Sequence, residues 1–145
     1  MRLIKLNESN IQEIILMESD SDTSRFILPY DDNKHREEIN KEQNLYLGIY
    51  ENGILSGFII LGIEDNGSRI EFRRIVVKEK GNGIGQRAIY ELENFCKDFW
   101  NTKSIWLDVF EDNKRGIHIY KKIGYELKSK SKFNSRNLLI MEKEL

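Results

Sequence analysis

The stretch "IVVKEKGNGIGQRAIYELENF", residues 75–95, places three glycines where a β-branched run gives way to helical spacing. Gly81, Gly83 and Gly85 supply backbone without a β-carbon, which lets a ligand approach the main chain closely. The pattern predicts a strand, a tight turn and a helix over residues 83–100. Because the first amides of a helix lack internal acceptors and face the positive end of its dipole, this junction is suited to bind a pyrophosphate. A flexible turn without a ligand has the same glycines, so the motif alone leaves both interpretations open.

The common phosphate-binding loops do not match this stretch. A Walker loop needs Lys and then Ser or Thr after its last glycine, whereas Gly85 is followed by Gln86 and Arg87. A dinucleotide-binding loop has the spacing G-x-G-x-x-G in an early parallel unit, but the spacing here is G-x-G-x-G after an antiparallel pattern. A protein-kinase domain needs far more chain than 145 residues.

Length and charge restrict the class of protein further. The 145 residues predict one domain over residues 1–145, and 23 basic against 24 acidic residues give a net charge of -1. No global field attracts nucleic acid or an anionic membrane, so neither is an expected partner. The single Cys96 forms no internal disulfide, and the first residues, "MRLIKLNESN", turn polar at once. We therefore expect a cytoplasmic protein, and the sequence leaves open whether it forms a homodimer.

Hydrophobic periodicity predicts a mixed order of strands and helices. Two helical segments, residues 8–19 and 32–44, follow a short first strand. Three alternating runs over residues 45–77, separated by "ENG" and "EDNGS", are typical of an antiparallel meander. After the glycine-led helix come a buried strand, a helix opened by Asn113 and a final strand pair. The class expected is α/β (α+β), with a helical crossover following the meander.

Two motifs together resemble one family. "KGNGIG" resembles the acyl-CoA-binding motif of the GNAT family of N-acetyltransferases, Gln/Arg-x-x-Gly-x-Gly/Ala. "DVFEDNKRGIHIYKKIGYEL" is similar to the second signature of that family, in which an Asn opens a helix, a Tyr follows and a Gly-aromatic pair ends it. Here these are Asn113, Tyr120 and Gly124 with Tyr125. The resemblance is strong over residues 71–127, and it rests on both motifs at the spacing of the family.

This resemblance implies the family fold, a mostly antiparallel mixed sheet of about seven strands flanked by about four helices, with CoA between two splayed strands. It implies an N-acetyltransferase that moves an acetyl group from acetyl-CoA directly to a primary amine of a small molecule or peptide. A catalytically silent acyl-CoA-binding or sensing domain is the alternative. The residues implied to bind the cofactor are Ile75, Val76, Val77, Lys80, Gly81, Asn82, Gly83, Ile84, Gly85, Gln86, Asn113, Gly116, Tyr120 and Lys122.

Two of these positions depart from the family pattern. Lys80 stands where Gln or Arg is usual, so it keeps a donor and a charge but lacks the planar fork of Arg. Gly116 stands where Ala is frequent and weakens its helix by up to ~1 kcal/mol. Close passage of the cofactor would account for that glycine, and so would neutral drift.

Acetyl transfer needs a neutral amine, a donor at the thioester carbonyl and a proton for the departing thiolate. The resemblance implies that Tyr120 supplies this proton and that a backbone amide within residues 75–77 supplies the donor. Glu71 is the expected base, and its alternative role is a surface ion pair with Arg69 or Arg73. Asp108, at a place where some family members carry an acid, is a second candidate base, and its alternative role, which we favour, is a structural acceptor near the Asn113 cap.

The remaining reactive side chains are assigned simpler roles. Cys96 follows an apolar stripe and is expected to fill the core. His35 and His118 lack metal-ligand spacing, so no metal is expected. Lys121 and Lys122 either meet the 3′-phosphate of CoA or form a solvated helix face. The acceptor region is expected to include "SRFILPYDDNKHREEI", where the side chains that either frame an amine or pack a loop are Arg25, Phe26, Tyr30, Asp31 and Asp32.

Overall fold

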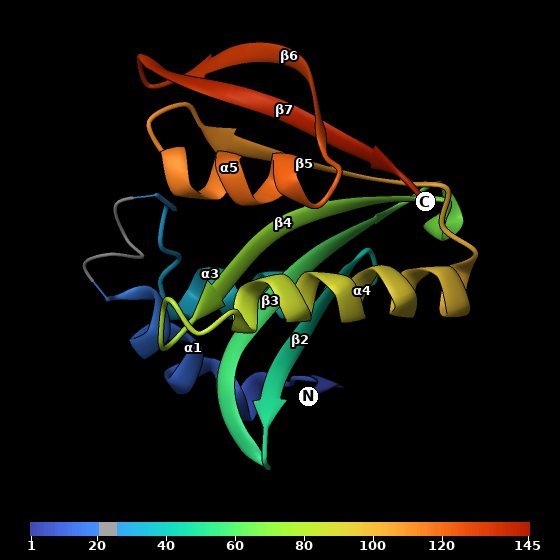
Figure 1. Cartoon of the computed structure of the whole chain (residues 1–145). Helices are drawn as coiled ribbons and strands as arrows, with labels where there is room; N and C mark the ends of the chain where they lie inside the picture. The colour runs from blue at the N-terminus through green and yellow to red at the C-terminus, as the bar shows by residue number, and fades with distance from the viewer. Residues whose placement is uncertain (21–25) are drawn as a thin grey trace.

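The computed structural model describes residues 1–20 and 26–145, and its strands form one seven-stranded mixed sheet (Figure 1). The order across the sheet is β1-β2-β3-β4-β5-β7-β6, and every neighbouring pair is antiparallel except β4 with β5. The expected meander, helical crossover and α+β class are therefore confirmed. The strands are β1 (Arg2–Lys5), β2 (Asn44–Glu51), β3 (Ile54–Glu64), β4 (Arg69–Val77), β5 (Ser104–Phe110), β6 (Glu126–Phe133) and β7 (Arg136–Glu144).

Helices cover both faces of the sheet. The helical elements are η1 (Glu8–Asn10), α1 (Ile11–Glu18), α3 (Asp32–Ile39), η2 (Asp65–Gly67), α4 (Ile84–Trp100) and α5 (Lys114–Lys122). α4 and α5 pack over the larger core cluster on one face, whereas α1 covers a smaller cluster on the other face, with α3 beside it (Figure 1). None of the helices in the part of the chain that the structure describes is long and apolar enough to cross a membrane.

The glycine-led helix has the predicted bounds. Gly83, in the left-handed conformation, caps the start of α4, and Asn101 ends it in the same conformation. The sequence spacing puts Phe99 on the apolar side of this helix, but it is 68% exposed and stacks on Phe95 at a centroid distance of 5.6 Å. The neighbouring Trp100 takes the inner position, where a β-carbon on Gly67 would lie 2.3 Å from its ring.

The two N-terminal helices differ from their predicted bounds. The first begins as the 3-10 turn η1, where Asn7 forms a capping box with Asn10. The second ends at Ile39 rather than at residue 44, with Asn40 as its C-cap. Asn44 begins β2 instead, so sheet pairing overrides the polar helical pattern of residues 40–44.

A β-bulge in β4 determines what faces each side of the sheet. In its pairing with β3, Ile60 opposes Arg74 and Leu61 opposes Phe72, which leaves Arg73 as the extra residue. A bulge of this kind reverses the alternation of side chains. As a result, Arg73 and Arg74 both reach the α1 and α3 side of the sheet, where Arg73 contacts Asn44.

β4 and β5 are paired over only part of their length. Their parallel register runs from Arg69 opposite Ser104 to Glu71 opposite Trp106 and then ends. Beyond this point β4 continues to Val77 and β5 to Phe110. Because the strands separate there, their facing edges are open toward the glycine loop and α5, as the resemblance implied.

Candidate active site

A cavity of about 870 Å³ lies between the separated ends of β4 and β5. Its size is within the range of small-molecule sites. It brings together both strands, the glycine loop, the first turn of α4, one face of α5 and residues 26–30. The predicted site residues that line it are Glu71, Ile75, Val76, Val77, Lys80, Gly81, Gly83, Ile84, Gly85, Gln86, Asp108, Asn113, Gly116 and Tyr120.

The glycine loop presents bare backbone to this cavity. Gly81 and Gly83 have φ values of +89° and +74°, so both require the conformational freedom of glycine. Gly85 has an ordinary φ, yet a β-carbon there would also meet none of the described atoms within 4 Å. Arg87 makes the first intrahelical bond, from its amide to the carbonyl of Gly83 at 3.1 Å. The amides of residues 84–86 precede that bond and are the ones that a helix leaves for an anion.

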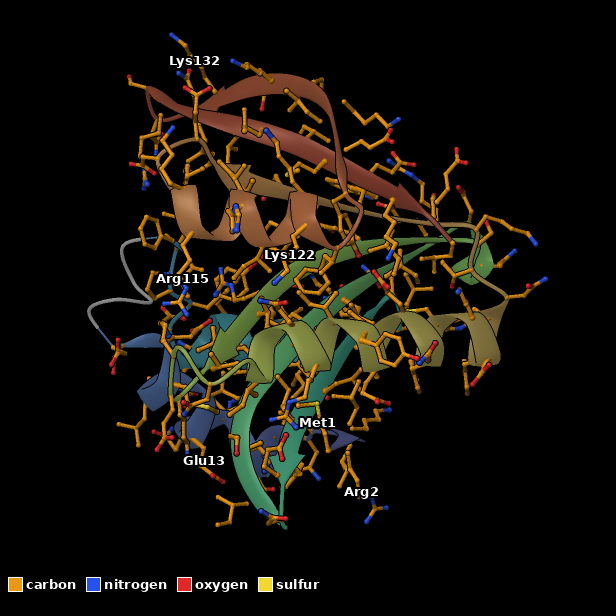
Figure 2. All side chains as sticks on the ribbon, in the orientation of Figure 1. Met1, Arg2, Glu13, Arg115, Lys122 and Lys132 are labelled. Atoms are coloured by element: carbon orange, nitrogen blue, oxygen red, sulfur yellow. The ribbon has the colours of Figure 1, made fainter. Side chains whose placement is uncertain are left out.

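Two cations of the glycine loop and α5, Lys80 and Arg115, line the cavity. The Lys80 Nζ donates to the carbonyl oxygen of Val77 at 3.0 Å. Lys122 does not line the cavity, but Arg115, which the sequence analysis did not select, does. Figure 2 shows Arg115 and Lys122 near the two ends of α5, on the side toward α4. Asn82 also lies outside the lining, where its amide donates to the carboxylate of Glu79 at 3.2 Å.

Two amides of β4 point into the cavity. The amide of Lys78 donates to the carbonyl of Ser56, which continues the β3 side of the ladder. Since alternate residues of an antiparallel strand bond to the same neighbour, Val76 also faces β3, while Ile75 and Val77 face the opposite edge. β5 is not paired with that edge. Of the three amides expected as donors to the thioester carbonyl, that of Val76 is therefore excluded, and those of Ile75 and Val77 remain candidates.

Tyr120 lies on the inner face of α5 against aromatic neighbours. Its ring meets Phe72 edge-on at 6.3 Å and Tyr125 at 6.0 Å. Burial, followed by the negative charge of Asp108, raises the pKa of Tyr120 to about 12. The phenol is therefore protonated at neutral pH and can donate a hydrogen bond or a proton.

Asp108 reaches the same cavity from β5. Burial and then the charge of Glu71 raise its pKa, while Arg73 and Arg74 act in the opposite direction. Among the described residues its carboxylate makes no hydrogen bond. Its interpretation as an acceptor near the helix cap is wrong, because Asn113 caps α5 with its own side chain.

The Asn113 cap also accounts for Gly116. The side-chain oxygen of Asn113 accepts from the amide of Gly116 at 3.0 Å. A β-carbon on Gly116 would lie 2.7 Å from the Asn113 side-chain nitrogen. A side chain at residue 116 would therefore displace the end of the Asn113 side chain, which the glycine avoids, and the glycine lines the cavity as well.

Glu71 is in the cavity wall but already has a partner. Its carboxylate accepts from the Nε and a terminal nitrogen of Arg73 at 3.2 and 3.0 Å. Arg73 also donates to the side chain of Asn44 at 3.1 Å. The alternative pairing with Arg73 that the sequence suggested is present.

The other residues selected from the sequence differ in whether they line the cavity. Cys96 is fully buried, and burial raises the pKa of its thiol to about 12, as expected for core filler. Phe26 and Tyr30 line the cavity, whereas Arg25 lies outside the described residues. Asp31 caps α3, accepting from the amide of Lys34 at 2.8 Å.

Asp32 and the histidines lie away from this cavity lining. Asp32 accepts hydrogen bonds from the side chains of Arg36 and Gln12, each at 2.8 Å. His118 is exposed on α5. His35 is fully buried between α3 and the sheet, a place that the polar sequence around it did not indicate.

Comparisons with known proteins agree with this geometry. Residues 11–125 match the family model described as the acetyltransferase (GNAT) family. A spermine/spermidine N(1)-acetyltransferase of Bacillus subtilis strain 168 is 29% identical over 112 residues, which span 70% of this chain and 74% of the relative. A probable spermine N(1)-acetyltransferase of Bacillus subtilis subsp. natto is 28% identical over the same shares.

Solved structures share the fold. The spermidine/spermine N-acetyltransferase SpeG of Vibrio cholerae superposes with a TM-score of 0.79 at 17% identity, covering 99% of this chain and 91% of that one. A ribosomal-protein alanine N-acetyltransferase of Escherichia coli gives 0.81 at 16% identity, with coverages of 99% and 92%. The curated relatives are named as enzymes, which favours an enzyme over a silent acyl-CoA-binding domain. The chain belongs to the GNAT acetyltransferase family, and it is an N-acetyltransferase.

Proposed function

We propose that this enzyme acetylates a polyamine such as spermidine and takes the acetyl group from acetyl-CoA. The observation that carries the proposal is the placement of Asp108, a carboxylate without a hydrogen-bonding partner among the described residues, in the same cavity as Tyr120. The relatives named as spermine and spermidine acetyltransferases support the choice of acceptor.

The open glycine loop fits the pyrophosphate of CoA. A β-carbon placed on Gly81, Gly83 or Gly85 would have no atom of the described residues within 4 Å, beyond those of its chain neighbours. The amides of residues 84–86 would hold the pyrophosphate, with Lys80, Asn82 and Lys122 as further donors toward phosphate oxygens. When bound, acetyl-CoA supplies an acetyl group activated as a thioester.

The protein supplies the donors and the proton transfers. The amides of Ile75 and Val77 would donate to the carbonyl oxygen, where negative charge develops during attack by the amine. Asp108 would accept a proton from the incoming ammonium group, directly or through one water. Tyr120 would give its phenolic proton to the sulfur as the carbon–sulfur bond breaks, and the second proton of the attacking nitrogen would then return to the phenolate.

Asp108 is the carboxylate of the cavity wall that an ammonium group of the acceptor could meet. Arg73 is paired with Glu71, and Arg74 is paired with Glu18. Neither arginine therefore neutralises Asp108 by direct contact. The ammonium group of an amine that approaches Tyr120 can therefore pair with this carboxylate.

An acceptor screen tests the proposal. The purified chain is mixed with acetyl-CoA and an amine, and the free thiol of CoA is followed for spermidine, spermine, diamines, simple monoamines, amino acids and alanine-led peptides. We expect the highest kcat/KM with the polyamines, and a mixture without amine corrects for hydrolysis. Higher kcat/KM with monoamines or peptides would contradict the choice of acceptor.

A further inference from the structure

Four polar side chains from four elements meet in the interior behind the cavity. They are Glu18 of α1, His35 of α3, Tyr46 of β2 and Arg74 of β4, and their exposed fractions are 1%, 0%, 1% and 7%. None belongs to the glycine loop or to α5. Polar groups buried to this degree are costly unless each has a partner.

The hydrogen bonds of this buried cluster are complementary. Glu18 accepts from Arg74 and lies 2.6 Å from Nε2 of His35. An ionised carboxylate only accepts, so Nε2 of His35 carries the proton. Nδ1 of His35 lies 2.9 Å from the hydroxyl of Tyr46, so both ring nitrogens have a partner.

A hydroxyl, an imidazole and a carboxylate in a row also occur where a nucleophile is activated. Here the hydroxyl belongs to Tyr46, which is 1% exposed and lies outside the lining of the cavity between β4 and β5. Burial further raises its pKa. The row therefore serves to hold Glu18 and, through it, Arg74.

Besides its bond to Glu18, Arg74 contacts two residues of the cavity wall, Leu28 and Tyr30. One terminal nitrogen donates to the carbonyl oxygen of Leu28 at 2.7 Å, and the guanidinium lies 4.3 Å from the ring centroid of Tyr30. Leu28 and Tyr30 both line the cavity. A single side chain of β4 thus fixes the position of residues 26–30 relative to the strand whose amides face the reacting group.

We infer that Arg74 is a positioning residue for the acceptor amine, acting through the wall formed by residues 26–30. This inference rests on the proposed function, since it requires an acceptor amine that binds against residues 26–30. Because the planar fork reaches a carboxylate, a carbonyl and a ring at once, Lys cannot replace all three contacts. The cofactor side makes none of them, so the affinity for acetyl-CoA should not depend on Arg74.

The test compares Arg74→Met and Arg74→Lys with Arg69→Met. Arg69 is a matched control on the same strand, because it also pairs with carboxylates and lies over a ring, that of Trp106, but it does not line the cavity. For Arg74→Met we expect the KM for spermidine to rise at least tenfold while the KM for acetyl-CoA stays within twofold. Arg74→Lys should lie between this variant and the wild type, and Arg69→Met should change neither KM by more than twofold.

A double-mutant cycle with Tyr30→Ala shows whether Arg74 acts through the wall. If it does, Arg74→Met raises the KM for spermidine less in the Tyr30→Ala background than in the wild type. Should Arg74→Met fail to fold, as judged by circular dichroism, the same measurements use the double variant Glu18→Met with Arg74→Met, which removes both buried charges.

Three results would overturn the inference. They are an unchanged KM for spermidine, an equal rise in both KM values, and full additivity with Tyr30→Ala. If the wild type turns over another amine but not spermidine, the choice of acceptor fails, and the cycle is run with that amine instead. If the wild type acetylates no amine, the proposed function fails and this inference fails with it.

Discussion

The two sides of the cavity are built in different ways. On the side proposed for the cofactor, the donors are the main-chain amides of Ile75, Val77 and residues 84–86, with glycines that keep the space open. On the acceptor side, residues 26–30 are held by Arg74, whose own position depends on Glu18. Main-chain groups in one continuous stretch are arranged by local geometry, whereas the acceptor side depends on long-range contacts between side chains. We therefore expect single substitutions to separate cofactor binding from acceptor binding.

The largest loss of activity should come from a substitution of Tyr120, which lies between the cofactor side and the acceptor side. Tyr120→Phe removes the proton donor but keeps the ring that packs on Phe72. We expect kcat to fall roughly 10²- to 10⁴-fold, the range for a positioned general acid, with little change in CoA affinity. Steady-state kinetics and calorimetric titration with CoA measure the two quantities. Tyr90→Phe, at an exposed position on α4, is the control, and equal kcat in both variants would reduce Tyr120 to a packing role.

The choice of base should give the next largest effect. We expect Asp108→Asn to lower kcat/KM at neutral pH by about 10², and Glu71→Gln to lower it less, because Glu71 is already engaged by Arg73. This order reverses the expectation from sequence. Since Asp108 must be ionised to accept a proton, its raised pKa should set the acidic limb of the pH profile. Asp108→Asn should remove that limb, and raising the pH should partly restore the rate by supplying neutral amine.

Asp108→Asn should also raise thermal stability at neutral pH. A carboxyl whose pKa is raised in the folded state binds its proton more tightly there, so its contribution to stability falls as the pH rises. The gain in Tm should therefore disappear in acid, below the pKa of the unfolded chain. A loss of Tm at neutral pH would show that Asp108 supports the fold rather than the reaction.

A smaller effect tests the cofactor side alone. Gly85→Ala is compatible with the backbone and meets no atom of the described residues, so it should raise helix stability by up to about 1 kcal/mol. The family motif accepts Ala at this position, so Gly85→Ala should leave the Kd for CoA within twofold, whereas the larger side chain of Gly85→Val should raise it about tenfold. Asn33→Ala, at an exposed position in the first turn of α3, is the matched control. Unchanged CoA affinity in Gly85→Val would show that the phosphate does not bind at this loop.

The smallest effect concerns the acid stability of the acceptor side. Burial acts to raise the pKa of Glu38, but hydrogen bonds from Lys34, Lys41 and Asn44 outweigh it and lower the pKa to about 2. The stability that Glu38 contributes is complete above pH ~4.5 and is lost as the pH falls toward 2. Because both lysines are more than a third exposed, solvent screening reduces this contribution to about 1–2 kcal/mol.

Chemical denaturation from pH 7 to pH 2.5 measures this contribution. Glu38→Gln should be less stable than the wild type at pH 7 and should lose less stability on acidification. Glu37→Gln, at the exposed neighbouring position, should follow the wild type. Identical pH curves for Glu38→Gln and the wild type would contradict the assignment.

The sequence by itself determined the fold class, the start of α4 at the glycine loop and the start of α5 at Asn113. Each of these depends on contacts within a few residues, such as a left-handed glycine or a capping amide, so the local pattern is sufficient. The bulge at Arg73 has no such local signal. It follows from the pairing of β4 with β3, and it decides that Arg73 and Arg74 face the same side.

Only the tertiary structure shows how the side chains that support the acceptor side are arranged. The spacing of residues 32–44 predicted a polar helix, and nothing in it indicated that His35 would be fully buried against Glu18 and Tyr46. The partners of Arg74 lie 46 and 56 residues away in the chain, and only the packing of α1 against the sheet brings them together. A local pattern carries no information on contacts at that separation, because their formation depends on the closing of long loops by the whole core.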